Sequence, residues 1–253
     1  MDSLKSINLN VIKESIDKIY LIGFGDFHFG AVECNLDAIE KQIKWIKDTP
    51  QARVILMGDL LNCGTKLSIG GGAFDDKFNP QEQLEKLEEL LLPIKNKIYG
   101  IHMGNHEQRI WNETGINVSK ILAKILGVKY LGYSAHTLIN VKGINYRIFS
   151  THGASNASLP YTKIKNCLDL VSFIDADVYM MGHVHALQVQ TQDVKRINLK
   201  NKTIDNDKKY FVLTGHYLNY ENSYAEMKNM RPSKQGCVKI RLDSERKDVH
   251  VSI

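Results

Sequence analysis

Short apolar runs alternate with amphipathic segments along the first half of the chain. Three runs rich in Ile, Leu and Val, each ending in or followed by glycine, are predicted to be buried strands: residues 18–23, 53–58 and 97–103. Apolar residues at helical spacing predict a helix over 35–48 and another beginning at 79–82, each headed by a capping asparagine. The order strand, helix, strand, helix, strand is typical of a parallel α/β unit.

The second half of the chain is mostly β. A helix over 118–126 stops at Gly127, and one further helix is predicted over 163–173. The predicted strands are residues 137–141, 146–150, 177–181, 210–214, 237–242 and 248–253. Two mixed sheets packed face to face, with helices on both outer faces, would bury the apolar sides of all these elements. We therefore expect one α/β domain over residues 1–253, built as a four-layer α/β/β/α sandwich.

Composition sets only broad limits on function. The chain has 33 Lys and Arg against 28 Asp and Glu, and this charge of +5 permits an anionic partner without requiring one. The four cysteines lie far apart with no CxxC pair, which favours reduced thiols. No apolar run has the length of a signal sequence or a membrane span, so we expect a cytoplasmic protein with no membrane partner. Nothing indicates an obligate protein partner.

Residue types that bind metals follow five of the predicted strands. The clusters are Asp26-x-His28, Gly58-Asp59, Gly104-Asn105-His106-Glu107, Thr151-His152-Gly153 and Gly182-His183-x-His185. Open α/β sheets bind ligands outside the carboxyl ends of their strands, which is where all five clusters fall. In the first cluster, a spacing of two would put carboxylate and imidazole on one side of an extended chain. Singly, each cluster is compatible with an ordinary structural role, but together they hold five of the nine histidines and indicate a site.

Seven of these side chains are candidate metal ligands. They are Asp26, His28, Asp59, Asn105, His152, His183 and His185. If Asp59 bridges, the set divides between two divalent ions, and mixed N and O donors without thiolate favour Mn, with Fe, Zn or Ni as alternatives. Two ions and two carboxylates leave a charge of about +2, which attracts an anion. A bridging hydroxide and a phosphate oxygen would complete the two-metal arrangement for displacement at phosphorus.

The third cluster also supplies groups for substrate binding and catalysis. Asn105 is a candidate substrate contact as well as a ligand, and His106 is the candidate acid that binds the phosphate or protonates the leaving oxygen. Glu107 is expected to accept a hydrogen bond that orients a histidine, and Gly104 to allow a tight turn. Arg109 is a candidate phosphate contact, with a structural salt bridge as the alternative.

The order of these motifs, from about residue 20 to residue 185, resembles the calcineurin-like metallophosphoesterase superfamily. The resemblance implies a sandwich of two sheets flanked by helices, with a dinuclear site at one end. It also implies a division of the ligands: Asp26, His28 and His185 on one metal, Asn105, His152 and His183 on the other, and Asp59 shared. His106 matches the non-ligand catalytic histidine of the family.

The resemblance leaves the substrate open. Asp59 is followed by Leu-Leu-Asn-Cys-Gly and lacks the arginine of the serine/threonine protein phosphatases. Glu107 stands where the repair-exonuclease branch typically has Asp, and the chain is too short for the full capping domain of that branch. The layout also resembles small phosphoesterases of bacteria and their phages. The main hypothesis is a metal-dependent phosphodiesterase, with nucleic acid or nucleotides as candidate substrates. The alternatives are a phosphomonoesterase of the protein-phosphatase type and a non-catalytic scaffold, which the complete ligand set argues against.

Most of the excess charge lies in residues 191–236, with nine Lys and Arg against five Asp and Glu. Tyrosines and cations are interspersed there, as a groove for single-stranded nucleic acid requires. His216 follows a predicted strand and is a candidate substrate contact. The alternative is a solvated hairpin over 195–209, with the tyrosines packed on the sandwich. The glycine-rich loop at Gly70–Gly72 follows the second motif and is a candidate lid.

Overall fold

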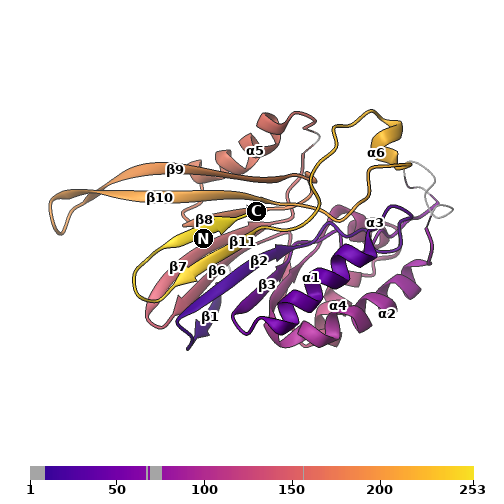
Figure 1. Cartoon of the computed structure of the whole chain (residues 1–253), viewed down its shortest axis with the longest axis horizontal. Coiled ribbons are helices and arrows are strands. Elements are labelled where there is room, and N and C mark those ends of the chain that lie inside the picture. Colours follow the sequence, from indigo (N-terminus) through magenta and orange to yellow (C-terminus); the bar gives the residue numbers. More distant parts are fainter. Residues whose placement is uncertain (1–8, 67, 69–75, 156) are drawn as a thin grey trace, which may run out of the picture.

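The computed structural model describes residues 9–66, 68, 76–155 and 157–253. Within these residues the chain forms two six-stranded sheets that pack face to face, with helices on both outer sides (Figure 1). The predicted four-layer sandwich of two mixed sheets is therefore confirmed. The candidate lid at Gly70–Gly72 lies outside the described residues.

One sheet contains the three strands predicted in the first half of the chain. Its strand order is β12-β11-β2-β3-β4-β5. The strands are β2 (Lys18–Phe24), β3 (Ala52–Leu56), β4 (Ile98–His102), β5 (Tyr130–Gly132), β11 (Lys239–Asp243) and β12 (Val249–Ser252). Strands β2 to β5 run parallel, while β11 pairs antiparallel with both β2 and β12.

The other sheet has the strand order β1-β6-β7-β8-β10-β9. Its strands are β1 (Asn10–Glu14), β6 (Ser134–Val141), β7 (Ile144–Thr151), β8 (Val178–Met181), β9 (Leu187–Asn198) and β10 (Thr203–Thr214). Strands β7, β8 and β10 run parallel, and β6 and β9 pair antiparallel at either side of them. The long β9–β10 hairpin projects beyond the rest of the molecule (Figure 1).

The helices cover the outer faces of both sheets. They are α1 (Leu36–Asp48), α2 (Pro80–Leu91), α3 (Asn105–Thr114), α4 (Val118–Leu126), α5 (Pro160–Leu168) and α6 (Tyr224–Met227), with short 3-10 segments η2 (Leu92–Lys97) and η3 (Asp169–Ser172). Helices α1, α2 and α4 share one apolar cluster with the outer face of β2 to β4, and α5 shares another with β7, β8 and β10. A third cluster fills the space between the sheets.

Side chains alternate between the two faces of a strand, so the short strand β2 contributes to two apolar clusters. In β2, Leu21 points into the cluster between the sheets, and Ile22 points outward beneath the helices. Successive side chains of a strand point to opposite faces, so a strand that is covered on both sides must be apolar throughout. This is why the predicted buried strands could be recognised as continuous apolar runs.

The two predicted helix caps are present. The side chain of Asn35 accepts a hydrogen bond from the backbone of Ala38 at 3.1 Å. Asn79 and Glu82 form a reciprocal capping box at the start of α2. Each cap satisfies N–H groups that have no partner within the helix and so fixes where that helix begins.

Parallel strands bring the polar clusters to one end of the sandwich. Strands β2, β3 and β4 of one sheet end beside β7, β8 and β10 of the other, and hydrogen bonds join the loops that follow them. The ring of His152, after β7, contacts the carbonyl oxygen of Met57, after β3, at 2.8 Å. The backbone N–H of His183, after β8, donates to the carboxylate of Asp26, after β2, at 3.0 Å.

Three of the predicted elements differ from the structure, and β1, β5 and α6 were not predicted. The tight turn expected at Gly104 is instead the start of α3, which has no apolar stripe because the only buried residue along it is Glu107. The helix predicted over 163–173 begins earlier, at Pro160, and finishes as a separate 3-10 turn. The hairpin that was an alternative for residues 195–209 is present, and both of its strands are longer than predicted.

Among the residues that the structure describes, no helix combines the length and the apolar character needed to cross a membrane.

Candidate metal centre

The loops that carry the predicted ligands have an unusual backbone. Asp26, His28, Asp59, His183 and His185 all have φ between 46° and 67°. This left-handed region is unfavourable for residues with a Cβ, and such residues cluster at functional sites. The extended geometry expected for Asp26-x-His28 is therefore wrong, because both residues turn sharply to point their side chains to the same place.

The first group of side chains comes from the loops after β2, β3 and β8. Asp26, His28, Asp59 and His185 each offer a ligand atom, and these atoms lie within 4.8 Å of one another. Nε2 of His28 is 3.0 Å from Nε2 of His185, which in turn lies 3.5 Å from Oδ1 of Asp26.

The second group shares Asp59 with the first. Asp59, His152 and His183 form a second set of converging ligand atoms. Nε2 of His152 lies 3.4 Å from the Asp59 carboxylate. The side-chain oxygen of Asn105 completes this half, at 3.0 Å from the ring of His152 and 2.7 Å from that of His183. The structure thus brings all seven predicted ligands together, with Asp59 between the two halves.

Glu107 holds the Asp59 loop in place. This buried carboxylate accepts hydrogen bonds from the backbone N–H groups of Gly104, Asp59, Leu60 and Leu61 at 2.7 to 3.1 Å. It contacts no histidine among the described hydrogen bonds, so its expected role in orienting an imidazole is wrong. Burial, together with the nearby Asp59 charge, raises the pKa of Glu107 to about 7.

Gly104 allows the backbone to pass very close to Asp59. Its φ of −94° is ordinary, so it makes no turn that other residues could not make. A Cβ at this position would lie 2.1 Å from the Asp59 carboxylate oxygen and 2.2 Å from its backbone nitrogen. Any side chain here would displace the shared carboxylate.

His106 lies beside the two groups. Its Nδ1 is 2.8 Å from the carbonyl oxygen of Asn62, and its Nε2 is 3.0 Å from the guanidinium of Arg109. Because a guanidinium has only N–H donors, Nε2 must accept, and the ring proton sits on Nδ1 and is donated to Asn62. Arg109 also donates to the Asn62 carbonyl at 3.3 Å, so both side chains are anchored to the same backbone oxygen.

Electrostatics favour a positive charge at the centre. Among the described residues, every cationic group within 4.0 Å of the buried Asp26 and Asp59 carboxylates is a histidine. Burial lowers the pKa of His152, but the carboxylates of Asp59 and Asp26 outweigh it and raise that pKa to about 10. The two buried carboxylates have no lysine or arginine partner, so they attract another positive charge, which is either a proton on His152 or a metal ion.

His28 of the first group is ready to act as a ligand. Burial lowers the pKa of His28 well below its ordinary value, and the neighbouring His106 lowers it further. A neutral imidazole has a free lone pair, which is the form that coordinates a metal ion. These buried His and Asp groups are able to bind metal ions, and their N and O donor set fits divalent ions of the Mn, Fe, Zn and Ni class.

Two other histidines have different surroundings. His216, after β10, is buried, and its ring stacks on that of His185 with centroids 5.3 Å apart. It accepts a hydrogen bond from the backbone of Leu218, and its Nε2 has no partner among the described residues. His102, inside β4, bonds Ser150 of the facing sheet at 2.8 Å and is structural.

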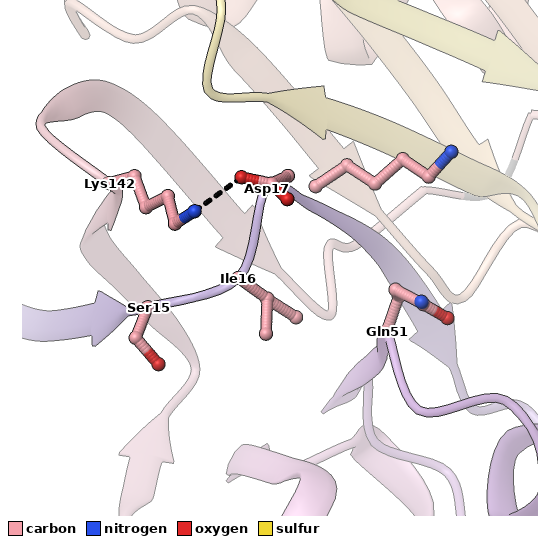
Figure 2. Close-up of a pocket in the computed structure, with 6 residues that line it drawn as sticks. Ser15, Ile16, Asp17, Gln51 and Lys142 are labelled. Atoms are coloured by element: carbon pink, nitrogen blue, oxygen red, sulfur yellow. Dashed lines mark hydrogen bonds and ion pairs between the residues drawn. The ribbon is translucent and has the colours of Figure 1, made fainter.

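A surface cavity of about 320 Å³ lies at the opposite end of β2 from the ligands (Figure 2). Asp17 and Lys142 face each other across it as an ion pair. It contains none of the predicted ligands, so the cluster of polar side chains identifies the site better than cavity size does.

Sequence reasoning missed the groups that act through their backbone. The carbonyl oxygens of Met57 and Asn62 set the tautomers of His152 and His106. A carbonyl oxygen has no signature in the residue type that carries it. Tyr217, one of the tyrosines of segment 191–236, agrees with the alternative expectation, because it is buried and packs edge-on against Phe24 and Phe27 beneath the Asp26 loop.

A two-sheet α/β sandwich with a buried His and Asp cluster able to hold metal ions defines the general class of this protein. The model of the family described as "Calcineurin-like phosphoesterase" matches residues 19–231, which includes every predicted ligand. The chain therefore belongs to the calcineurin-like phosphoesterase family.

Three solved structures are similar over most of the chain. A conserved uncharacterized protein and predicted phosphoesterase from Streptococcus pneumoniae is 12% identical, with 94% of this chain and 90% of that one covered and a TM-score of 0.39. A metallophosphoesterase from Sphaerobacter thermophilus is 14% identical, with 92% and 87% covered and a TM-score of 0.44. Vps29 from Entamoeba histolytica, solved with Zn²⁺, is 13% identical, with 92% and 90% covered and a TM-score of 0.46. No curated protein matches the chain.

Proposed function

We propose that this protein is a metal-dependent phosphodiesterase that acts on nucleotides or nucleic acid. The observation that carries the proposal is the convergence of two buried ligand groups on one shared carboxylate, Asp59. Two adjacent cation sites are suited to displacement at phosphorus, because the developing charge on both the attacking and the leaving oxygen is then stabilised. The basic segment 191–236 favours an anionic substrate.

Two divalent ions are the cofactors, with Mn as the first choice and Fe, Zn or Ni as alternatives. Asp26, His28 and His185 would hold one ion, and Asn105, His152 and His183 would hold the other, with Asp59 available to both. When bound, such ions lower the pKa of water and polarise a phosphoryl oxygen. The neutral amide of Asn105 completes the second half without cancelling further positive charge.

His106 and Arg109 handle the substrate. The Arg109 guanidinium, now engaged with Nε2 of His106 at 3.0 Å, is placed to take a phosphate oxygen. A phosphate that draws Arg109 away frees the lone pair of Nε2 of His106. With Nδ1–H still donated to the Asn62 carbonyl at 2.8 Å, Nε2 takes up a proton from water, and the resulting imidazolium gives that proton to the leaving oxygen.

Turnover after metal removal tests the proposal. Chelator-treated protein should not hydrolyse bis(p-nitrophenyl) phosphate, and added Mn²⁺ should restore hydrolysis. p-Nitrophenyl phosphate, measured in parallel, distinguishes a diesterase from a monoesterase, and a strong preference for the monoester would overturn the diester assignment. Activity that is insensitive to the chelator would refute the metal-dependent mechanism.

His106→Asn tests the acid. We expect kcat for the diester to fall by about 10² to 10⁴ while Mn²⁺ binding is kept, because His106 belongs to neither ligand group. His136→Asn is the matched control, since His136 of β6 packs edge-on against Phe149 of β7 and belongs to neither ligand group. An unchanged kcat in His106→Asn would show that another group protonates the leaving oxygen.

A further inference from the structure

A second cavity, of about 230 Å³, adjoins the candidate metal centre. Three segments form it: the residues directly after His185, the beginning of α5, and residues 231–234. Ala186, which lines the cavity, follows His185 in the chain, so their Cα atoms are ~3.8 Å apart. A ligand bound at the centre therefore has this cavity as its neighbour.

The cavity is positively charged. Lys163, Arg231 and Lys234 line it, and among its described lining residues none is Asp or Glu. Within the described part of the chain, none of the three cations has a carboxylate within 4.0 Å as an ion-pair partner. Burial lowers the pKa of Lys163, and no nearby carboxylate offsets this effect.

The start of α5 adds to the positive potential of the cavity. Pro160, its first residue, lines the cavity, and the cap residue Leu159 provides no side-chain hydrogen bond to the helix. The N-terminus of a helix carries partial positive charge and free N–H groups, which favour an anion in addition to the three side chains.

His216 connects the cavity with the metal centre. Its ring stacks on His185, with the planes 17° apart. The backbone N–H of Gly215, the residue before His216, donates to the carbonyl oxygen of Ala186 in the cavity wall at 3.0 Å. His216 therefore lies between the metal ligands on one side and the cavity on the other.

We propose that this basic cavity binds a second phosphate group of the substrate, and that the substrate is a nucleic acid strand in which a neighbouring phosphate lies next to the one that is cleaved. This inference rests on the proposed function. The apolar atoms of Leu187 and Pro232 in the same cavity suit the sugar that joins two such phosphates. A diester with a single phosphate leaves the cavity unused.

The test compares substrates that differ only in the number of phosphates. The Mn²⁺-loaded protein is given bis(p-nitrophenyl) phosphate, the dinucleotide TpT, and the same dinucleotide with one further phosphate, pTpT or TpTp. We expect kcat/KM to be at least about tenfold higher for one of the two-phosphate dinucleotides than for TpT at low salt, with the advantage shrinking as salt is added. Which of the two is favoured tells on which side of the scissile bond the cavity lies.

The variant that removes the cations is Lys163→Gln combined with Arg231→Gln and Lys234→Gln. It should lose the two-phosphate advantage and keep kcat/KM for bis(p-nitrophenyl) phosphate, since none of these residues belongs to the ligand groups. Lys195→Gln is the matched control, because Lys195 is an exposed cation of the β9–β10 hairpin outside the cavity. If the triple variant keeps the advantage, the inference is wrong.

Binding gives a readout that does not depend on turnover. The Kd of a fluorescein-labelled thymidine trinucleotide for chelator-treated protein should rise about tenfold or more in the triple variant and stay unchanged in Lys195→Gln. An unchanged Kd in the triple variant overturns the cavity assignment, whatever the activity. Absence of diester turnover in the wild-type protein, with the Kd difference intact, would overturn the proposed function and leave the cavity assigned to oligonucleotide binding.

Discussion

Residues of the candidate centre combine strained backbone with buried charge. His185 has φ of 46°, and four other predicted ligands share this left-handed conformation. A residue other than glycine in this conformation lowers the stability of the fold by about 1–3 kcal/mol. The packing of the sandwich must compensate for this cost, and the benefit is a set of side chains that needs no rearrangement to receive a cation.

This strain can be measured at His185. In metal-free protein, His185→Gly should be more stable than His185→Ala by about 1 kcal/mol, because glycine adopts positive φ without penalty. At positions with negative φ, a glycine variant is normally less stable than the alanine variant. Urea unfolding of both variants gives the difference, and an alanine variant as stable as the glycine variant would show that the backbone is not strained.

Glu107 is the residue whose loss should disturb the fold most directly. Glu107→Gln replaces one carboxylate oxygen by an NH₂ group, which then faces backbone N–H donors that have no acceptor. We expect the free energy of unfolding to fall by about 2–4 kcal/mol, read from denaturant unfolding. Glu113→Gln, on the exposed side of the same helix, should change it by less than about 0.5 kcal/mol. Equal effects of the two substitutions would contradict the structural role of Glu107.

Residue types alone were enough to find the side chains that converge at this end of the sandwich, because carboxylate, imidazole and amide groups seldom follow so many successive strands unless they share a site. They were not enough for Glu107, since its partners are backbone amides, which every residue except proline possesses. No sequence pattern marked Lys163 as part of a binding site. It is an ordinary helix residue that lines the basic cavity only because the fold brings residues 186–188 and 231–234 beside it.

Elements were predictable where they bury apolar residues and unpredictable where they do not. Helix α1 buries Ile39, Ile43 and Ile46 at helical spacing, and its bounds agree with the prediction. Helix α3 buries only one residue, the polar Glu107, so its sequence has no apolar stripe and its start was interpreted as a turn. The outer parts of β9 and β10 are polar on both faces, which conceals their alternation.

The tip of this hairpin is predicted to be dispensable. Ile197, Leu199 and Ile204 are 77%, 86% and 67% exposed, so they contribute little burial. Ile197 pairs with Ile204, and replacing residues 198–203 by Asn-Gly would close the hairpin at that pair with a type I′ turn. Unfolding free energy should change by less than about 1 kcal/mol, and kcat/KM for bis(p-nitrophenyl) phosphate should be unchanged. A large loss of that activity would place the tip in the catalytic apparatus.

At the scale of the whole molecule, an ion cluster joins three neighbouring strands in the interior of one sheet. Arg147 donates to Asp177 at 2.5 Å, and the fully buried Lys209 lies 2.8 Å from Asp207 and 3.4 Å from Asp175. These residues come from β7, the start of β8 and β10, so the cluster fixes the relative position of three parallel strands. The four-layer architecture followed from apolar patterning, but this cluster did not, because its members are distant in sequence.

Acid should weaken this cluster. Burial raises the pKa of Asp177, but hydrogen bonds from Arg147 and Lys247 outweigh it and hold the pKa below its ordinary value of 3.8. A carboxyl group whose pKa is depressed by folding stabilises the protein above its unfolded pKa, and this contribution is lost as pH falls through the folded value. The free energy of unfolding should therefore fall more steeply below about pH 4 in the wild type than in Asp177→Asn. The exposed Asp193→Asn should follow the wild type, and identical pH profiles for all three proteins would contradict a stabilising role for the Asp177 carboxylate.

The central claim is that seven side chains hold two metal ions with Asp59 between them, and calorimetric titration with Mn²⁺ tests it most directly. Chelator-stripped wild-type protein should bind two Mn²⁺ per chain. His28→Ala should lose one site, and Asp59→Ala should weaken both together, because its carboxylate belongs to both ligand groups. Wild-type binding of fewer than two ions, or an Asp59→Ala variant that binds Mn²⁺ as the wild type does, would contradict the shared dinuclear centre.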